Sequence, residues 1–360
     1  MAIIDSDTHV IETDRTWDYL AEKDKRFRPK VFIAANPDKG GNEEKQWVID
    51  GDMYPMRLFD PEKTGTPQGA RELEDVDLRL KHMDELGVDL QVIYPTTLLG
   101  LFCTARRETQ VALCQAYNRW IADICAQSKG RLRWVVAPPV RDMDAAIAEL
   151  RLGKEKGACG VMMHGLVDDL PPNDPYLFPL YEEASNLDLP ICFHAGEGSP
   201  ALRSVLHSRA NILWRAKVPV FTAFHTLILS KLPDRFPQIR WGFVETGASW
   251  LPYIMHDLGA RNMGSGTNIS SVGRVIKPAD PDLLRKNRMY VACEVHDDLP
   301  YITKYVGDDN IVAGSDYGHA DTSSVLDALG QLKQQGEREE VSQETLRKIM
   351  DDNARALYGL

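Results

Sequence analysis

The stretch AIIDSDTHV, residues 2–10, contains the first strand of the chain and its first two candidate metal ligands. Its apolar, β-branched opening predicts a buried strand over residues 2–7. Two polar residues, Asp7 and His9, close that strand. Side chains two positions apart on a strand point to the same face, so Asp7 and His9 can act together on one ligand.

Further short apolar runs follow this strand, and longer segments with helical spacing lie between them. Such alternation predicts a parallel sheet, and eight repeats predict its closure into a barrel. An open doubly wound sheet is the alternative, but no glycine-rich phosphate loop follows the first strand. We therefore expect an α/β fold, a (β/α)₈ TIM barrel that forms a single domain over residues 1–360. The other predicted strands are 89–95, 132–138, 159–164, 190–195, 239–245, 288–294 and 310–315, and the predicted helices are 75–86, 108–127, 143–156, 176–187, 251–262 and 299–306.

Two segments are too long for simple strand–helix connections. Residues 12–72 predict an elaborated first loop, an insertion that lies at the catalytic end of the barrel as a lid or pocket wall. Within it, Gln46–Asp50 and Met53–Arg57 predict a small hairpin. Residues 197–236 hold enough chain for two helices.

The composition of the chain limits its partners. With 42 basic and 53 acidic residues, the formal net charge is −11, which disfavours nucleic acid and anionic membranes. The chain begins without a basic leader and contains no run of about 20 apolar residues, so we expect a cytoplasmic protein that spans no membrane. Six scattered cysteines without a C-x-x-C pair predict reduced core thiols: Cys103, Cys114, Cys125, Cys159, Cys192 and Cys293.

Residues of the kind that bind metals recur where predicted strands end. Asp7 and His9 close the first strand, His194 closes the fifth, and Asp316 follows the eighth. Strand ends of a barrel converge on one mouth, and two imidazoles with two carboxylates suit a first-row divalent ion. A single such residue is more often a cap or a structural group, but four at three strand ends favour a metal site.

Several motifs, in this order along the chain, resemble one protein family. The chain is similar to the amidohydrolase superfamily, in the branch that contains aminocarboxymuconate semialdehyde decarboxylase and γ-resorcylate decarboxylase. The resemblance covers nearly the whole chain. The matching stretches are IDSDTHVIE, DVDLRLKHMDELGVDLQVIYPT, AYNRWIADICA, RLRWVVAPPV, GACGVMMHG, LDLPICFHAG, LPDRFPQIRWGFVETGASWLP and NIVAGSDYGHAD.

The resemblance implies one divalent metal ion as cofactor. Its ligands would be Asp7, His9, His194 and Asp316, and a carboxylate in the first position makes Mn²⁺ an alternative to Zn²⁺. Binuclear members of the superfamily carry a carboxylated lysine after the fourth strand. This chain has His164 there, so we expect a single ion.

One departure from the family pattern concerns catalysis. The similar decarboxylases carry a histidine after the sixth strand, whereas this chain has Glu245 in the sequence FVETGASWLP. Glu245 could act as a general acid or base, or it could orient a metal ligand. The resemblance also implies that Asp316 takes part in catalysis as a proton carrier. His225 lies in a predicted helix, where a structural role is the commoner one.

Five further residues are candidates for substrate binding by their position. Trp17 and Arg57 lie in the elaborated first loop, and Arg57 could hold a substrate carboxylate through two hydrogen bonds. Glu12 follows the first strand, His164 ends the fourth, and His319 follows the eighth. Each of them also has an ordinary structural interpretation, as a solvated, capping or core residue.

Three functional hypotheses follow. The first is metal-dependent, non-oxidative decarboxylation of an aromatic or muconate-type carboxylic acid. The alternative is hydrolysis of a C–N, C–O or C–C bond by metal-bound hydroxide, with Glu245 or Asp316 as the base. The third is a non-catalytic barrel that only binds a ligand. We expect a small organic acid as substrate, and by analogy with similar proteins a homodimer.

Overall fold

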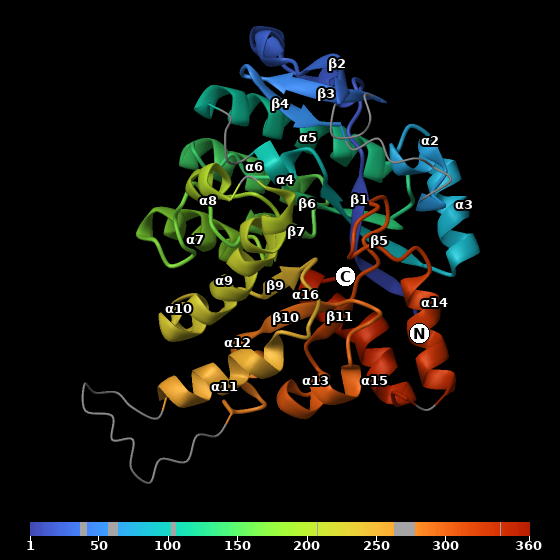
Figure 1. The fold of residues 1–360 in the computed structure, drawn as a ribbon, viewed down its shortest axis with the longest axis vertical. Coiled ribbons are helices and arrows are strands. Elements are labelled where there is room, and N and C mark those ends of the chain that lie inside the picture. The colour runs from blue at the N-terminus through green and yellow to red at the C-terminus, as the bar shows by residue number, and fades with distance from the viewer. Residues whose placement is uncertain (37–41, 57–63, 102–105, 207, 263–277, 339) are drawn as a thin grey trace.

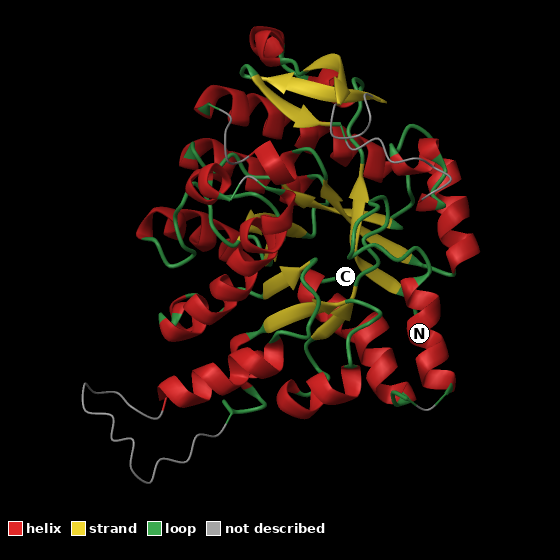
Figure 2. Cartoon of the chain, viewed as in Figure 1, coloured by secondary structure: helices red, strands yellow, loops and turns green. Residues whose placement is uncertain are grey.

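Eight parallel strands form one sheet in the computed structural model, and helices surround it (Figure 2). The order of the strands in the sheet is β1-β5-β6-β7-β8-β9-β10-β11. Their bounds are Ile4–Val10, Leu90–Pro95, Leu132–Val136, Gly160–His164, Ile191–His194, Trp241–Val244, Met289–Cys293 and Ile311–Ala313. The structure describes residues 1–36, 42–56, 64–101, 106–206, 208–262, 278–338 and 340–360.

The first and last strands meet and bring the sheet round into a barrel. Thr8 of β1 forms a parallel bridge with Tyr317, which lies beyond the end of β11. The backbone N–H of Asp316 donates to the carbonyl of Asp7 at 2.9 Å, and the N–H of His9 donates to the carbonyl of Tyr317 at 2.7 Å. The predicted (β/α)₈ TIM barrel is thereby confirmed.

The first strand is longer than its sequence pattern predicts. β1 extends to Val10, three residues beyond the predicted end, because Thr8, His9 and Val10 continue to pair with β5. The pairing register shifts between Asp5 and Thr8. Both candidate ligands of the opening stretch therefore lie inside the strand.

Helices follow the strands around the barrel, and short polar side chains fix where several of them begin. The side chain of Asp75 accepts the N–H of Leu78 at 2.9 Å at the start of α3, and Asp142 accepts that of Ala145 at 3.1 Å at the start of α6. The helices are α2 Gln68–Arg71, α3 Val76–Leu86, α4 Leu98–Leu101, α5 Arg107–Ala126, α6 Met143–Glu155, α7 Phe178–Asn186, α8 Pro200–Val205, α9 Val218–Leu229, α10 Leu232–Arg235, α11 Leu251–Asn262, α12 Leu283–Asn287, α13 Leu299–Val306, α14 Ala328–Glu337, α15 Gln343–Arg347 and α16 Asn353–Tyr358.

The segment between β8 and β9, for which the sequence predicts two helices, holds α8, α9 and α10 and shorter helical turns. The three helices that end the chain have no counterpart in the sequence prediction. None of the described helices is both long enough and apolar enough to cross a membrane.

The long first loop carries a small antiparallel sheet of its own, which lies above α5 in Figure 1. Its strands are β2 Lys30–Asn36, β3 Asn42–Ile49 and β4 Asp52–Pro55. β3 and β4 form the predicted hairpin, and β2 adds a strand that the sequence did not predict. Asp50 joins the hairpin to α5, since its carboxylate accepts the N–H of Arg106 at 2.8 Å and the hydroxyl of Thr109 at 2.7 Å.

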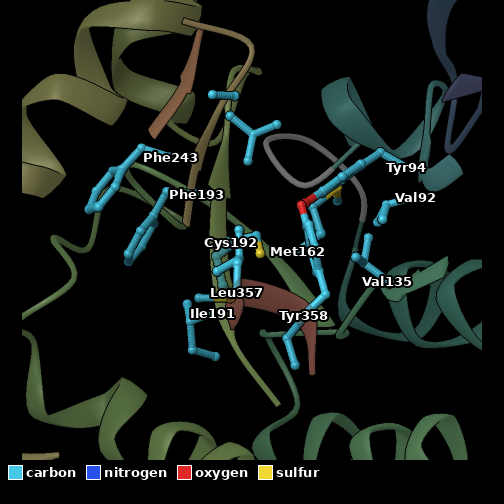
Figure 3. Close-up of a cluster of buried hydrophobic side chains, with 14 of the residues drawn as sticks. Val92, Tyr94, Val135, Met162, Ile191, Cys192, Phe193, Phe243, Leu357 and Tyr358 are labelled. Carbon is cyan, nitrogen blue, oxygen red and sulfur yellow. The ribbon is translucent and has the colours of Figure 1, made fainter. Parts of the chain in front are cut away.

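The C-terminal helix α16 packs against several barrel strands at once. The hydroxyl of Tyr358 donates to the carbonyl of Ser6 at 2.9 Å and lies 2.9 Å from the hydroxyl of Tyr94. Figure 3 shows the two tyrosines meeting beside Met162 and Cys192. The described cysteines are buried and free, namely Cys114, Cys125, Cys159, Cys192 and Cys293.

Candidate metal centre

Four side chains from the C-terminal ends of barrel strands converge at the mouth of the barrel. Nε2 of His9 lies 3.6 Å from Oδ1 of Asp7 and 3.4 Å from Oδ1 of Asp316. Nε2 of His194 lies 3.3 Å from Oδ1 of Asp7. All four residues are buried. The structure thus brings together the four residues that the sequence predicts as metal ligands.

A fifth side chain, that of Glu245, reaches the same point from the end of β9. Its Oε2 lies 3.5 Å from Nε2 of His9 and 3.2 Å from Nε2 of His194. Two overlapping sets within the described residues have the spacing of metal ligands and share His9. The first consists of Asp7, His9 and His194, and the second consists of His9, Glu245, Asp316 and His319.

The two histidines present the same nitrogen to the carboxylates. Nδ1 of His9 lies 3.0 Å from the carbonyl oxygen of Pro95, and Nδ1 of His194 lies 2.7 Å from that of Ala195. A carbonyl oxygen only accepts hydrogen bonds, so Nδ1 of each ring carries a proton. When the ring is neutral, its Nε2 therefore carries a lone pair. Histidines that ligate metals are commonly held through such a bond.

Several polar atoms at this point are buried without a hydrogen bond. Among the described residues, Nε2 of His9, Oε2 of Glu245 and both carboxylate oxygens of Asp316 have no hydrogen-bonding partner. Buried polar atoms without partners are costly, and lone pairs that face carboxylate oxygens repel them. A divalent cation would give each of these side chains a partner, so the residues present fit a metal ion.

The electrostatics of the metal-free centre show the same need for positive charge. Burial alone would raise the pKa of Asp7, but hydrogen bonds and charge from His194 and His9 outweigh it, and the pKa is lowered. The pKa of His9 is raised to about 9, because Asp7 and Glu245 outweigh the effect of burial. Burial and the nearby carboxylates, with Glu245 first among them, raise the pKa of Asp316 well above its usual value.

His319 lies against one of the carboxylates, that of Asp316. Its Nδ1 lies 2.8 Å from Oδ1 of Asp316, and its Nε2 lies 2.8 Å from the hydroxyl of Thr96. The ring stacks on that of His9, with centroids 3.7 Å apart. Thr96, His319 and Asp316 therefore form a continuous chain of polar contacts that ends at the candidate centre.

The remaining predicted substrate-binding residues lie in different surroundings. Glu12 is buried and accepts the backbone N–H groups of Thr96 and Thr97 at 3.0 and 2.8 Å. Trp17 lies fully buried in the core, edge-on to Trp47. A contact of either residue with substrate stays a prediction.

His164 ends β7, and its Nδ1 lies 3.3 Å from the carbonyl oxygen of His194. Burial lowers the pKa of His164 to about 4. Arg57 lies outside the described residues. His225 pairs with Asp257 at 2.8 Å, between α9 and α11, as its helical position predicts for a structural histidine.

Three residues that support the centre did not stand out in the sequence. Thr96 contacts His319, and Asp297 accepts backbone N–H groups of the turn that follows Glu245. Both follow the ends of barrel strands, as Asp316 does, and this position is a sequence signal for such residues. Arg79 of α3 donates to the carbonyl of His9 at 3.3 Å and lies 3.8 Å above the ring of Tyr317. An arginine within a helical pattern carries no sequence signal of such a contact.

Comparison with known sequences gives a family match and several relatives. The model of the family described as amidohydrolase matches residues 4–360. 2-Amino-3-carboxymuconate-6-semialdehyde decarboxylase of Dictyostelium discoideum is 23% identical over 299 residues, 79% of this chain and 77% of the relative. γ-Resorcylate decarboxylase of Polaromonas sp. is 27% identical over 61% of this chain and 70% of the relative. A 2-keto-4-carboxy-3-hexenedioate hydratase of Sphingobium sp. is 23% identical over 80% of this chain and 85% of the relative.

Solved structures share the fold over the full length of the chain. An amidohydrolase from Mycobacterium avium subsp. paratuberculosis superposes with a TM-score of 0.75 at 18% identity, covering 100% of this chain and 98% of that one. A dihydroxybenzoic acid decarboxylase from Polaromonas sp. was solved with manganese and the inhibitor 2-nitroresorcinol. It gives a TM-score of 0.66 at 19% identity, and the match covers 100% of this chain and 97% of that one.

Proposed function

The chain belongs to the amidohydrolase family, and on that premise we propose that it is a metal-dependent, non-oxidative decarboxylase of an aromatic or muconate-type carboxylic acid. One observation carries the proposal. Asp7, His9, His194 and Asp316 converge at the barrel mouth, where a cation would satisfy several buried atoms without partners. Decarboxylases of such acids among the relatives support the choice of reaction.

The proposed cofactor is one divalent ion, Zn²⁺ or Mn²⁺, held by Asp7, His9, His194 and Asp316. When bound, it would supply Lewis-acid polarisation and a template for the substrate carboxylate and a neighbouring oxygen. The substrate would then be a small organic acid whose carboxylate lies close to a second oxygen of the same molecule.

Asp316 is the proposed proton donor. In a non-oxidative decarboxylation the bond from carbon to the carboxylate breaks, CO₂ leaves, and a proton takes its place on the carbon. Asp316 lies among the candidate ligands and contacts His319, which in turn contacts Thr96. The three residues provide a path along which Asp316 can be reprotonated after each turnover. Glu245 is the second proposed catalytic residue.

Substrate contacts are proposed for five residues. His164 ends β7, His319 lies in the loop that follows β11, Glu12 holds the loop that begins at Thr96, and Trp17 and Arg57 belong to the elaborated first loop. A homodimer and a cytoplasmic location complete the proposal.

Hydrolysis is the second candidate, and the identity of residue 245 favours it. A carboxylate beside the ligands, where similar decarboxylases carry a histidine, is a suitable base for activating water. The two reactions differ in their products. Decarboxylation releases CO₂, whereas hydrolysis in H₂¹⁸O places ¹⁸O in the product.

The test begins with elemental analysis of the purified protein by plasma mass spectrometry. The metal-loaded protein is then incubated with hydroxybenzoates and muconates, and CO₂ release is followed together with ¹⁸O uptake from labelled water. We expect near one equivalent of metal and release of CO₂ without ¹⁸O in the organic product. Metal binding with ¹⁸O uptake and no CO₂ would instead support hydrolysis. A protein that binds no zinc or manganese contradicts both.

A further inference from the structure

We infer that Glu245 is itself a ligand of the divalent ion, through Oε2. The inference rests on the proposed metal centre and adds a residue to it. It concerns the resting protein, so it can be tested without a substrate.

The distances around Glu245 match those around the residues already proposed as ligands. Oε2 of Glu245 lies 3.2 Å from Nε2 of His194, and Oδ1 of Asp7 lies 3.3 Å from the same atom. Nε2 of His9 lies 3.5 Å from Oε2 of Glu245 and 3.4 Å from Oδ1 of Asp316. Atoms that share an ion at about 2.1 Å lie about 3.0–3.4 Å apart, for bond angles between 90° and 109°. Glu245 meets this spacing as well as Asp7 and Asp316 do.

No hydrogen bond within the described residues accounts for the position of Oε2. The atom is buried and makes no hydrogen bond. Its neighbours are the Nε2 atoms of His9 and His194, and both rings hold their protons on Nδ1 towards backbone carbonyls. In the neutral form in which both rings can bind a metal, two lone pairs and a carboxylate oxygen face one another, an arrangement that a cation between them stabilises.

The backbone directs Glu245 to this point in the same way as it directs Asp316. The φ angles of Glu245 and Asp316 are 58° and 55°, both in the left-handed region. The turn after Glu245 is fixed by Asp297, which accepts the N–H groups of Ala248 at 2.8 Å and Ser249 at 3.0 Å. Glu245 thus shares its backbone conformation with a residue already proposed as a ligand, and a hydrogen-bonded turn follows it.

A fifth protein ligand changes which ion the site prefers. Asp7, Asp316 and Glu245 would supply three oxygen ligands beside the two histidine nitrogens. Zn²⁺ most often takes four ligands, whereas oxygen-rich sites of higher coordination number suit Mn²⁺. We therefore expect Glu245 to favour Mn²⁺ over Zn²⁺.

The test measures Mn²⁺ binding to the metal-stripped protein from the EPR signal of the free ion, followed by competition with Zn²⁺. Glu245→Gln keeps the size of the side chain and removes its charge. Glu294→Gln is the matched control, because Glu294 is a buried carboxylate at the end of the next strand, β10, paired with Lys217 at 3.1 Å. Thermal unfolding of each metal-free variant checks that it is folded.

We expect Glu245→Gln to weaken Mn²⁺ binding by more than about 100-fold, beyond the loss that an outer-sphere partner causes, to weaken Zn²⁺ binding less, and Glu294→Gln to leave both within about threefold. If Glu245→Gln binds Mn²⁺ as the parent does, Glu245 is not a ligand. A parent protein that binds no Mn²⁺ also overturns the inference. Failure to release CO₂ from any acid, with the expected metal affinities intact, would contradict the proposed reaction alone.

Discussion

Glu245 and Asp316 share a left-handed backbone, with φ of 58° and 55°, and both direct a carboxylate towards the imidazole of His9. Residues other than glycine adopt this conformation at a cost of about 1–3 kcal/mol and persist in it where the surrounding structure enforces it. In this chain the enforcing structure is the barrel, which closes directly beside Asp316 through the bridge of Thr8 with Tyr317. Local strain and the crowding of negative charge therefore coincide at the candidate centre.

Replacing Glu245 by glycine should stabilise the metal-free protein. Glycine adopts a positive φ without strain, and the substitution removes a buried carboxylate oxygen that has no hydrogen bond. We expect the free energy of unfolding to rise by about 1 kcal/mol, measured by urea denaturation with a chelator present. Val244→Gly, at the preceding core position, should lower it. A loss of stability in Glu245→Gly would show that the native backbone is not strained.

Replacing His194 by alanine should abolish metal binding and activity together. The substitution removes one of the two imidazoles and leaves Oδ1 of Asp7 without its closest histidine. The expected loss of metal affinity exceeds about 100-fold, beyond what loss of an outer-sphere partner costs. Plasma mass spectrometry after desalting gives the metal content. His164→Ala is the control, and it should retain the metal because His164 does not belong to either ligand set.

Removing the metal should lower the melting temperature. Without a cation, the carboxylates at the mouth repel one another, and the pKa of Asp316 is raised well above its usual value by burial and by Glu245. An ion at a hundredfold excess over its dissociation constant stabilises the native state by about 2.7 kcal/mol. Scanning calorimetry of the chelated and Mn²⁺-loaded protein should therefore show a rise of several degrees. His194→Ala should show none, and an equal rise in that variant would mean that Mn²⁺ acts elsewhere.

The barrel and its ligands could be predicted because their signals are local. Each strand is a short apolar run, and His194 and Asp316 stand where such a run ends, so position along a strand suffices to predict that they meet. The predicted end of β1 falls three residues short because Asp7, Thr8 and His9 are polar, and only pairing with β5 shows that the strand continues to Val10.

Other features depend on contacts between distant parts of the chain. β2 belongs to a sheet only through its partner β3, and no periodicity in its own residues predicts that pairing. The approach of Glu245 to two histidines depends on a positive φ, which is expected of glycine and not of glutamate. The contact of Tyr358 with Ser6 joins residues 352 positions apart, beyond the reach of any local pattern.

A buried carboxylate away from the mouth should make stability depend on pH. Burial raises the pKa of Glu149 above its unfolded value of 4.5, and the carboxylate accepts one hydrogen bond from Asn118 at 2.9 Å. The folded state thus favours the protonated form. The contribution of protonated Glu149 to the free energy of unfolding is fully present below pH 4.5 and is lost as the pH rises through the pKa of the folded state.

Glu149→Gln removes this titration while keeping a hydrogen-bond acceptor. The variant should therefore gain stability relative to the parent as the pH rises from 4 to 8, as measured by urea denaturation at each pH. Glu155→Gln, at an exposed position of the same helix, is the control and should follow the parent. A constant difference between Glu149→Gln and the parent across this range would show that Glu149 does not titrate differently on folding.

Replacing Asp297 by alanine should disturb the centre from a distance. The buried carboxylate of Asp297 accepts the N–H groups of Glu294, Ala248 and Ser249 at 2.8, 2.8 and 3.0 Å, so it ties the end of β10 to the turn that follows Glu245. Hydrogen bonds to a charged group contribute about 1.5–3 kcal/mol each, and the three N–H groups would lose their acceptor. We expect Asp297→Ala to lower the free energy of unfolding by at least about 2 kcal/mol.

The same substitution should also weaken the metal site, because Glu245 loses the turn that holds it. Mn²⁺ affinity, measured by EPR, should fall by about 10–100-fold, the range found for outer-sphere partners. Asp297→Asn separates the two effects, since its amide oxygen can still accept from the backbone and should recover part of both losses. If Asp297→Ala destabilised the fold but bound Mn²⁺ with parental affinity, the turn would be dispensable for the site, and β9 alone would suffice to direct Glu245 to the histidines.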